Sequence, residues 1–256
     1  METFFSRINI LGTRIDNVTE AEALRRISAL LDSGRTSMIA TVNPEFLMEA
    51  RHNTEFRSAL NASILNVPDG FGIRLVCLWR GIRIKERVTG ADVLVRMCQM
   101  ASERHQGVFL FGAMDGVALA AAAELKRQFP NLVIAGAENE FDSDGQERSE
   151  EQVCERIRNA KPAILFVALG APKQEFWIRK NLAKLPSVRV AMGVGGSFEY
   201  LSGDLRRAPQ FFRRIGFEWL WRLLLQPGRW RRIVTAVFIF PWTVLRTPRA
   251  IVTELS

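Results

Sequence analysis

An aspartate directly follows a short, mostly apolar segment in the first third of the chain. Residues 64–67 have the pattern of a buried strand, and this segment ends at Pro68, Asp69 and Gly70. Ligands of open α/β sheets bind outside the carboxyl ends of the strands, so we expect Asp69 at the mouth of a cleft. A carboxylate in that place is a candidate general base, because burial beside a bound substrate raises its pKa toward neutrality. Aspartates at such turns also commonly cap the next helix, and these residues taken alone favour capping.

Polar and glycine-rich residues follow the other predicted strands at the same point. Thr41 and Asn43 stand at the end of the strand predicted over 37–42, and Pro44 allows a helix to begin at once. The other residues of this kind are Gly112, Gln174, Gly193, Gly195, Gly196 and Glu199. Because the carboxyl ends of parallel strands meet at one edge of a sheet, these residues are predicted to line a single rim, which is typical of a binding site.

Two charged features are candidates for binding a diphosphate. Arg87 precedes a helix predicted to begin at Gly90, where the helix N-terminus favours an anion, although an ordinary surface arginine is the simpler interpretation of Arg87 alone. Asp142 and Asp144 form a D-x-D pair, which many sugar-nucleotide enzymes use to hold Mg²⁺ or Mn²⁺. Asp, Ser and Gly are also ordinary turn residues, so we favour a turn over a metal site and predict metal-independent chemistry.

The positive charge of the chain is concentrated in its last fifty residues. The net charge is +8, and residues 206–249 hold ten arginines and a single acid, Glu218. Four of the six tryptophans lie among these arginines, and an apolar stretch over 238–245 is interrupted by Pro241. Arginine and tryptophan beside aliphatic residues suit the headgroup layer of an anionic bilayer. Packing against the core is the second interpretation, and nucleic-acid binding is a distant third.

Alternating strands and helices predict an α/β fold with a mostly parallel, six-stranded, Rossmann-like sheet and helices on both faces. Residues 1–205 are expected to form the core, and residues 206–256 a helical, membrane-binding appendage. Cys77, Cys98 and Cys154 lack metal-ligand spacing and indicate buried thiols in a reducing compartment. Neither a signal peptide nor a run of ~20 apolar residues is present, so we expect a cytoplasmic protein bound peripherally to the inner face of the cell membrane.

Taken together, the motifs resemble those of the WecG/TagA/CpsF family of bacterial glycosyltransferases, glycosyltransferase family 26. The resemblance covers nearly the whole chain, with the motifs in order. The matching segments are Thr41-Val42-Asn43, Pro68-Asp69-Gly70-Phe71-Gly72, Arg87 to Asp92, Gly170 to Glu175, and the run from Gly193 to Arg232. The resemblance implies inverting transfer of an N-acetylmannosamine-type or related sugar from a UDP donor. The implied acceptor is undecaprenyl-diphosphate-linked N-acetylglucosamine or a similar lipid-linked sugar, in cell-surface polysaccharide or teichoic acid assembly.

The resemblance also implies a role for each candidate residue. Asp69 becomes the expected base for the acceptor hydroxyl, with Thr41 and Asn43 hydrogen-bonded to the acceptor sugar. The residues expected to hold the UDP-sugar are Gly112, Phe141, Gln174, Gly193, Gly195, Gly196 and Glu199, with Phe141 stacked on uracil and Glu199 bound to the ribose. Negative charge develops on the leaving UDP, and arginines are permanently charged and fit phosphate geometry. The arginines expected there, in place of a metal, are Arg87, Arg222, Arg229 and Arg232.

Two functions of other classes stay open at this point. An NAD-type oxidoreductase on the same scaffold lacks support, because the turn after Gly112 does not complete the G-x-G-x-x-G fingerprint. A non-catalytic membrane adaptor lacks support, because an adaptor needs no carboxylate in a cleft. A thermal-shift comparison of UDP with NAD separates the two enzymes. The sequence does not fix the oligomeric state, and a homo-oligomer is one alternative.

Overall fold

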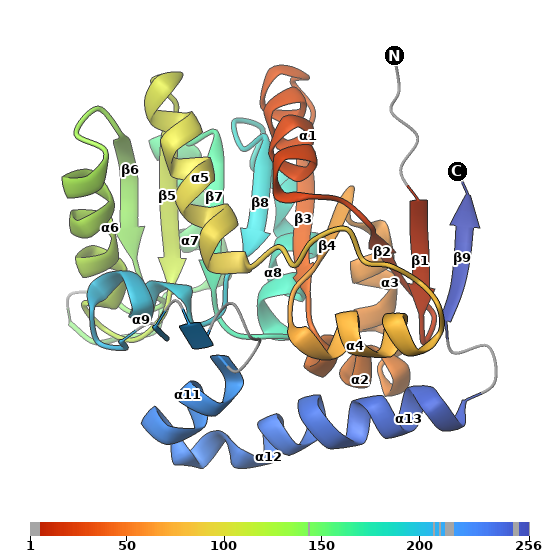
Figure 1. Ribbon diagram of the computed structural model, residues 1–256. Helices are drawn as coiled ribbons and strands as arrows, with labels where there is room; N and C mark the ends of the chain where they lie inside the picture. Colours follow the sequence, from red (N-terminus) through yellow and green to blue (C-terminus); the bar gives the residue numbers. More distant parts are fainter. Residues whose placement is uncertain are drawn as a thin grey trace. The chain divides into compact units, whose positions relative to one another are not determined.

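The computed structural model of the chain describes residues 6–142, 144–206, 208–209, 211–212, 218–247 and 251–255 (Figure 1). Its main sheet has six strands in the order β4-β3-β8-β7-β5-β6. The strands are β3 (Ser37–Val42), β4 (Leu65–Pro68), β5 (Gly107–Gly112), β6 (Val133–Glu138), β7 (Ile164–Ala168) and β8 (Val190–Gly193). The pairs β3 with β8, β8 with β7, β7 with β5, and β5 with β6 are all parallel. The predicted six-stranded α/β fold is therefore confirmed.

The chain divides into two compact units, and the division passes through β3 and α1 (Glu20–Asp32). The first, called here the β4 unit, consists of Met1–Ala23, Ala40–Thr89 and Arg206–Ser256. The second, called the β5 unit, consists of Leu24–Ile39 and Gly90–Leu205. Each unit is described by itself below.

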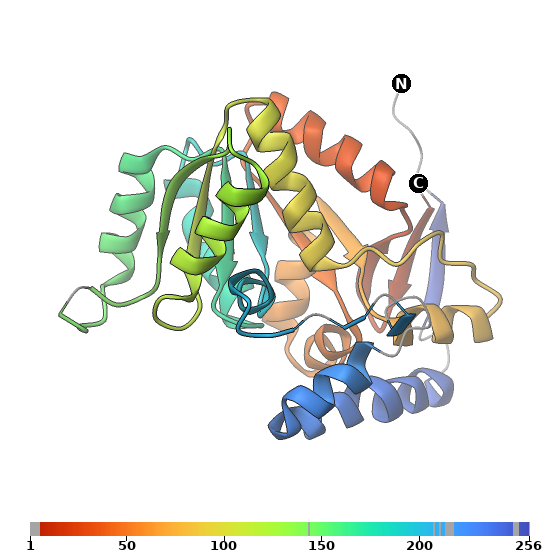
Figure 2. The ribbon, with the colours of Figure 1, turned by 60° about the vertical axis from the view of Figure 1, so that its left-hand side comes forward.

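In the β5 unit, helices cover both faces of the strands. Helices α5 (Gly90–Glu103) and α6 (Val117–Gln128) lie on one face, and α7 (Glu150–Ala160) and α8 (Lys173–Asn181) lie on the other (Figures 1 and 2). The 3-10 turn η1 (Leu182–Lys184) follows α8, and the short helix α9 (Ser197–Ser202) follows β8. Apolar strand residues such as Phe111 pack against apolar helix residues such as Trp177, with ring centroids 5.0 Å apart. This core holds the strand ends, and thus the loops that follow them, in fixed positions.

The β4 unit contains a second, antiparallel sheet with the order β2-β1-β9. Strands β1 (Ser6–Ile10) and β2 (Thr13–Asp16) form a hairpin around Gly12, where φ is 86°. Strand β9 (Ile251–Leu255) pairs with β1, and the sequence did not predict it. This unit also contains three helices between β3 and Arg87: α2 (Pro44–His52), α3 (Thr54–Ala62) and α4 (Phe71–Trp79).

Residues 218–247 form the helical segment of the β4 unit. Its elements are α11 (Glu218–Leu225), the 3-10 turn η2 (Pro227–Arg229), α12 (Trp230–Val234), the π-helical turn η3 (Thr235–Ile239) and α13 (Phe240–Arg246). Pro241 interrupts the apolar stretch over 238–245 in the sequence, and the helix continues through it. The π-turn precedes Pro241, which lies in the first turn of α13, where its missing N–H is tolerated.

The segment from α12 to α13 packs directly on α4. Phe240 is fully buried, and a Cβ atom added to Gly72 would lie 3.6 Å from its ring and 3.2 Å from the Ala236 carbonyl oxygen. At the other end of α4, the Arg80 Nη2 group donates to the Val244 carbonyl oxygen over 2.8 Å. These contacts fasten α13 along the length of α4. Within the described residues, no helix is both long enough and apolar enough to cross a membrane.

Candidate active site

Asp69 lies on the turn between β4 and α4, at the carboxyl end of β4. Its backbone N–H donates to the Val42 carbonyl oxygen at the end of β3 over 2.8 Å, which holds the two strand ends together. Gly70, with φ 102°, occupies the N-cap position of α4 and makes no side-chain cap hydrogen bond. The cap position therefore belongs to Gly70 and not to Asp69. The Asp69 side chain is half-buried, as is suitable for a base that must reach a substrate hydroxyl.

Thr41 and Asn43 lie next to this turn, at the end of β3. Asn43 is the N-cap of α2, and its Oδ1 atom accepts from the Phe46 N–H over 3.0 Å. A Cβ atom on Gly70 would lie 3.9 Å from the Asn43 Cβ and 3.0 Å from a Pro44 side-chain carbon, so this turn runs against the start of α2. The structure thus brings Asn43 and Asp69 together, and Thr41 lies in β3 one residue before the carbonyl group that the Asp69 N–H binds. With one lone pair of Oδ1 used for the cap, Asn43 can still offer a sugar hydroxyl the second lone pair of Oδ1 or its Nδ2 group.

Arg87 lies in the irregular segment that follows α4, beside the Asp69 turn. The neighbouring Val88 N–H donates to the Pro68 carbonyl oxygen over 3.0 Å, which fixes this segment against the end of β4. The Arg87 side chain is part-buried, and its Nη2 group donates to Oε2 of Glu218, the first residue of α11, over 2.7 Å. A carboxylate from the C-terminal helical segment therefore binds the guanidinium that the sequence assigned to phosphate.

The sequence also assigned three arginines of the C-terminal helical segment to phosphate, and the structure describes the side chains of two of them. Arg232 on α12 forms an ion pair with Glu45 in the first turn of α2, with 2.6 Å between Nε and Oε2. Arg229, at the end of η2, is half-buried. The side chain of Arg222 lies outside the described residues. The helical segment therefore contacts α2, the helix that Asn43 caps.

In the β5 unit, Gln174 connects the loops that follow β7 and β8. Its Nε2 group donates to Oε1 of Glu175 over 2.7 Å, and its Oε1 atom accepts from the Gly195 N–H over 3.0 Å. A Cβ atom on Gly193 would lie only 2.5 Å from the Gln174 Nε2 atom, so only glycine fits at the end of β8. Two segments that were predicted separately to hold the donor, Gln174 and the loop from Gly193 to Gly196, are thus joined by hydrogen bonds.

Glu175 is a buried acid at the centre of this network. Its side chain is 1% exposed, and its Oε2 atom has no hydrogen-bond partner among the described residues. Burial raises the pKa of the Glu175 carboxyl group to about 7, against the opposing effect of the hydrogen bond from Gln174. The carboxyl group therefore exchanges its proton near neutral pH.

The other residues predicted to bind the donor have varied surroundings. Gly112, with φ 101°, packs so closely that an added Cβ would lie 2.9 Å from the Ala168 carbonyl oxygen. Packing is therefore sufficient to explain this glycine. Gly196 occupies the N-cap position of α9, and Glu199 lies in its first turn with a buried Oε2 atom that has no partner within the described chain. Phe141 is 46% exposed, which is high for an aromatic side chain.

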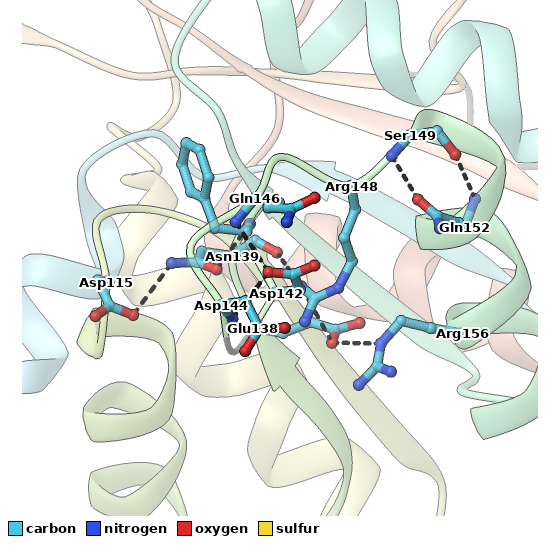
Figure 3. Close-up of polar contacts among 11 residues, drawn as sticks. Asp115, Glu138, Asn139, Asp142, Asp144, Gln146, Arg148, Ser149, Gln152 and Arg156 are labelled. Carbon is cyan, nitrogen blue, oxygen red and sulfur yellow. Dashed lines mark hydrogen bonds and ion pairs between the residues drawn. The ribbon is translucent and has the colours of Figure 1, made fainter.

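Asp142 and Asp144 of the D-x-D sequence lie in a turn after β6 (Figure 3). The Oδ1 atom of Asp142 accepts from the backbone N–H groups of Asp144, over 3.0 Å, and of Gln146, over 2.9 Å. Nearby, the Glu138 carboxylate is bound by Arg156 at 2.6 Å. In the part of the chain that the structure describes, no group of three or more His, Cys, Asp or Glu residues is suitable for holding a metal ion. These bonds are turn chemistry, and metal independence stays a prediction.

Two acids in these networks received no role from the sequence. Glu218 had a visible signal, because it is the single acid among the arginines of residues 206–249. Glu175 had none, because a glutamate in a polar segment at the start of a helix is ordinarily exposed. The three cysteines Cys77, Cys98 and Cys154 are buried free thiols, as predicted, and burial raises the pKa of Cys77 to about 12.

The chain is similar to known glycosyltransferases over most of its length. A family model described as "Glycosyl transferase WecG/TagA/CpsF family" matches residues 8–251. A relative from Bacillus spizizenii (strain W23) is 37% identical over 205 residues, which are 80% of this chain and 77% of the relative. A relative from Staphylococcus aureus (strain NCTC 8325) is 31% identical over 250 residues, which are 96% of this chain and 95% of the relative. Both relatives are named N-acetylglucosaminyldiphosphoundecaprenol N-acetyl-beta-D-mannosaminyltransferase.

Proposed function

Because this chain belongs to the WecG/TagA/CpsF family of glycosyltransferases, we propose that it transfers an N-acetylmannosamine-type sugar from UDP to undecaprenyl-diphosphate-linked N-acetylglucosamine. The names of the two relatives support the transferred sugar and the acceptor. The resemblance noted in the sequence supports UDP as the carrier of the donor sugar. Family membership confirms the predicted glycosyltransferase class and displaces the oxidoreductase and adaptor alternatives. The product would serve in cell-surface polysaccharide or teichoic acid assembly.

The observation that carries the proposed mechanism is the position of Asp69 beside Asn43, at the ends of β3 and β4. In this mechanism an acceptor hydroxyl oxygen attacks the anomeric carbon of the donor from the face opposite the diphosphate. The hydroxyl proton passes to the Asp69 carboxylate. The bond between the anomeric carbon and the diphosphate oxygen breaks, and its electron pair leaves on UDP. A single attack from the opposite face inverts the anomeric centre.

Arginines are the proposed source of charge stabilisation for the leaving UDP. Arg87 is supported by its place beside the Asp69 turn and by the hydrogen bond between Val88 and Pro68. Guanidinium groups suit this work because they hold a permanent charge and bind phosphate oxygens through several N–H donors. Metal-independent transfer is supported by the turn hydrogen bonds that engage the Asp142 carboxylate. We propose that residues 206–256 act as the membrane-binding appendage. Three arginines of this stretch would add positive charge beside the leaving UDP: Arg222, Arg229 and Arg232.

Donor binding is proposed for the network of the β5 unit. The hydrogen bond from the Gly195 N–H to the Gln174 Oε1 atom would hold Gln174 and the loop from Gly193 to Gly196 together around the diphosphate and the sugar. The Gln174 amide has a second N–H beyond the one donated to Glu175, and this N–H would bind the donor. Glu199 would accept from the ribose hydroxyls, which would give its buried Oε2 atom a partner. Phe141 would stack on the uracil, which its exposure allows.

A peripheral membrane position is supported by an apolar surface on the β4 unit. We define this surface by six residues that are between 44% and 65% exposed: Leu78, Trp79, Phe238, Ile239, Trp242 and Leu245. Leu78 and Trp79 come from α4, and the other four come from η3 and α13. The Arg246 guanidinium lies 4.0 Å from the Trp242 ring centroid, so a cation borders the apolar surface. Apolar and aromatic side chains beside arginines suit the interface of an anionic bilayer, the proposed site of the lipid acceptor.

A transfer assay tests the proposed function. UDP-N-acetylmannosamine, UDP-N-acetylglucosamine and UDP-glucose are each offered with short-chain polyprenyl-diphosphate N-acetylglucosamine, and the products are identified by mass spectrometry. We expect one added N-acetylhexosamine from UDP-N-acetylmannosamine. Transfer from another UDP-sugar alone would overturn the donor assignment. The absence of transfer with every pair would overturn the proposed substrates.

A further inference from the structure

Glu218 is the single acid among the arginines of residues 206–249, and its described ion pair is with an arginine outside that stretch. The distance from Arg87 Nη2 to Glu218 Oε2 is 2.7 Å, and the two side chains are only 18% and 26% exposed. A charge-assisted hydrogen bond that is largely shielded from water is stronger than one between exposed side chains. The first residue of α11 therefore holds the arginine that lies beside the Asp69 turn.

The backbone on both sides of Arg87 is anchored independently of Glu218. The Lys85 N–H donates to the Asn17 Oδ1 atom over 2.8 Å, and the Val88 N–H donates to the Pro68 carbonyl oxygen over 3.0 Å. The conformation of the long side chain is thus the main freedom left to this arginine. An unbound arginine side chain samples many rotamers, and a fixed carboxylate selects among them. Among the described residues, Glu218 provides the carboxylate that binds the Arg87 guanidinium.

We propose that Glu218 is a positioning residue that aims the Arg87 guanidinium at the diphosphate of the leaving nucleotide. The inference rests on the proposed function, in which Arg87 stabilises that diphosphate. A guanidinium has five N–H donors, so a contact at Nη2 is compatible with simultaneous binding of phosphate oxygens. A charge that is already aimed needs no reorganisation when the bond breaks, so the benefit appears in kcat. Helix α11 would in this way set the geometry of a group outside the helical segment.

A competing role for Glu218 predicts the opposite effect on UDP binding. A carboxylate could occupy the place of a phosphate and have to leave before UDP binds. Removing its charge would then tighten UDP binding and leave kcat unchanged or higher. A positioning residue gives the reverse pattern, with a lower kcat and no gain in UDP affinity. The two roles are therefore distinguishable in one variant.

The test is a double-mutant cycle on the full chain with Glu218→Gln and Arg87→Ala. Glutamine keeps the size and one acceptor oxygen of Glu218 but removes its charge. We expect Glu218→Gln alone to lower kcat at least about tenfold, the effect of losing one charge-assisted hydrogen bond. In the Arg87→Ala background the same change should alter kcat less than about twofold, because Glu218 acts through Arg87. Glu218→Asp, which keeps the charge, should recover part of the loss.

Controls separate this inference from folding and from the proposed function. Glu124→Gln removes one partner of the 2.7 Å ion pair with Arg127 on the surface of α6 and should leave kcat and UDP affinity unchanged. Unfolding midpoints of all variants show whether a loss of activity is a loss of fold. Equal losses from Glu218→Gln in both backgrounds, or tighter UDP binding, would overturn the positioning role alone. Normal kcat in a folded Arg87→Ala variant would instead overturn the proposed role of Arg87.

Discussion

Replacing Glu175 with glutamine is expected to change how the stability of the protein depends on pH. Burial raises the pKa of this carboxyl group from 4.5 to about 7 in the folded state. The folded protein therefore holds the proton more tightly than the unfolded chain. The resulting stabilisation is fully present below pH 4.5, decreases as the pH rises, and is lost once the pH passes about 7. A difference of this size corresponds to about 3 kcal/mol of unfolding free energy, at roughly 1.4 kcal/mol per pKa unit.

Glutamine at position 175 retains an acceptor for the Gln174 amide but has no proton to lose. The difference in unfolding free energy between the wild type and Glu175→Gln should therefore shift by about 3 kcal/mol in favour of the variant between pH 4.5 and pH 8. Other titrating groups are common to both proteins and cancel in this difference. Any constant cost of burying the glutamine amide also cancels, because only the change with pH is compared.

Urea unfolding at half-unit pH intervals, followed by circular dichroism, measures this difference. The control is Glu124→Gln, because the ion pair with Arg127 and the hydrogen bond from Gln128 lower the pKa of Glu124 to about 2. Its difference from the wild type should be constant between pH 5 and pH 8. If Glu175→Gln also gives a constant difference over that range, the Glu175 carboxyl group is not buried as described, and the reasoning fails.

Four further outcomes are expected. Asp69→Asn should lower kcat by roughly 10²–10⁴-fold while the unfolding midpoint is retained, and near-normal turnover would rule out Asp69 as the base. Trp242→Asp should abolish sedimentation with phosphatidylglycerol vesicles, and unchanged vesicle binding would remove the apolar surface from the proposal. EDTA should leave activity intact, whereas a loss that Mg²⁺ restores would overturn metal independence and return Asp142 and Asp144 as candidate ligands. Gly193→Ala should raise the KM for the UDP-sugar and lower stability by about 1–3 kcal/mol, and an unchanged KM would separate this loop from donor binding.

The strands of the main sheet were predictable because their signals are local. Apolar runs such as residues 164–168 end at glycines and polar residues, which mark both the strand and the loop that follows it. The same local signals placed Asp69 at a strand end beside Asn43. The hairpin at Gly12 was predictable for the same reason, since glycine is the residue that most readily adopts positive φ in a turn.

The features that the sequence did not predict depend on partners far away along the chain. Strand β9 exists through its pairing with β1, and residues 251–255 alone do not identify that partner. The ion pair of Arg87 with Glu218 joins an irregular segment to the first residue of α11, and no periodicity connects the two. The π-turn that precedes Pro241 was not predictable from composition. Local patterns therefore located the candidate base but not the contacts around Arg87.

Deleting residues 206–256 would not test membrane binding by itself, because the deletion would also disrupt the fold of the β4 unit. The deletion would remove β9 from the antiparallel sheet and the buried Phe240 from its packing on α4. A loss of vesicle binding would then be inseparable from a loss of fold. Substitutions on the apolar surface, such as Trp242→Asp, avoid this difficulty because Trp242 is 57% exposed.

The pairing of β9 with β1 has a consequence for biosynthesis. The β5 unit ends at Leu205, so all of its residues have left the ribosome while the later part of the chain is still being made. The β4 unit is built from three separate stretches of the chain. Strand β1 can pair with β9 only after Ile251–Leu255 has emerged from the ribosome. Domains generally fold as they are synthesised, and contacts between distant segments form late. A nascent chain stalled before residue 251 is therefore expected to carry a folded β5 unit and an incomplete β4 unit, so Asp69 would reach its final surroundings only after residues 251–255 have emerged.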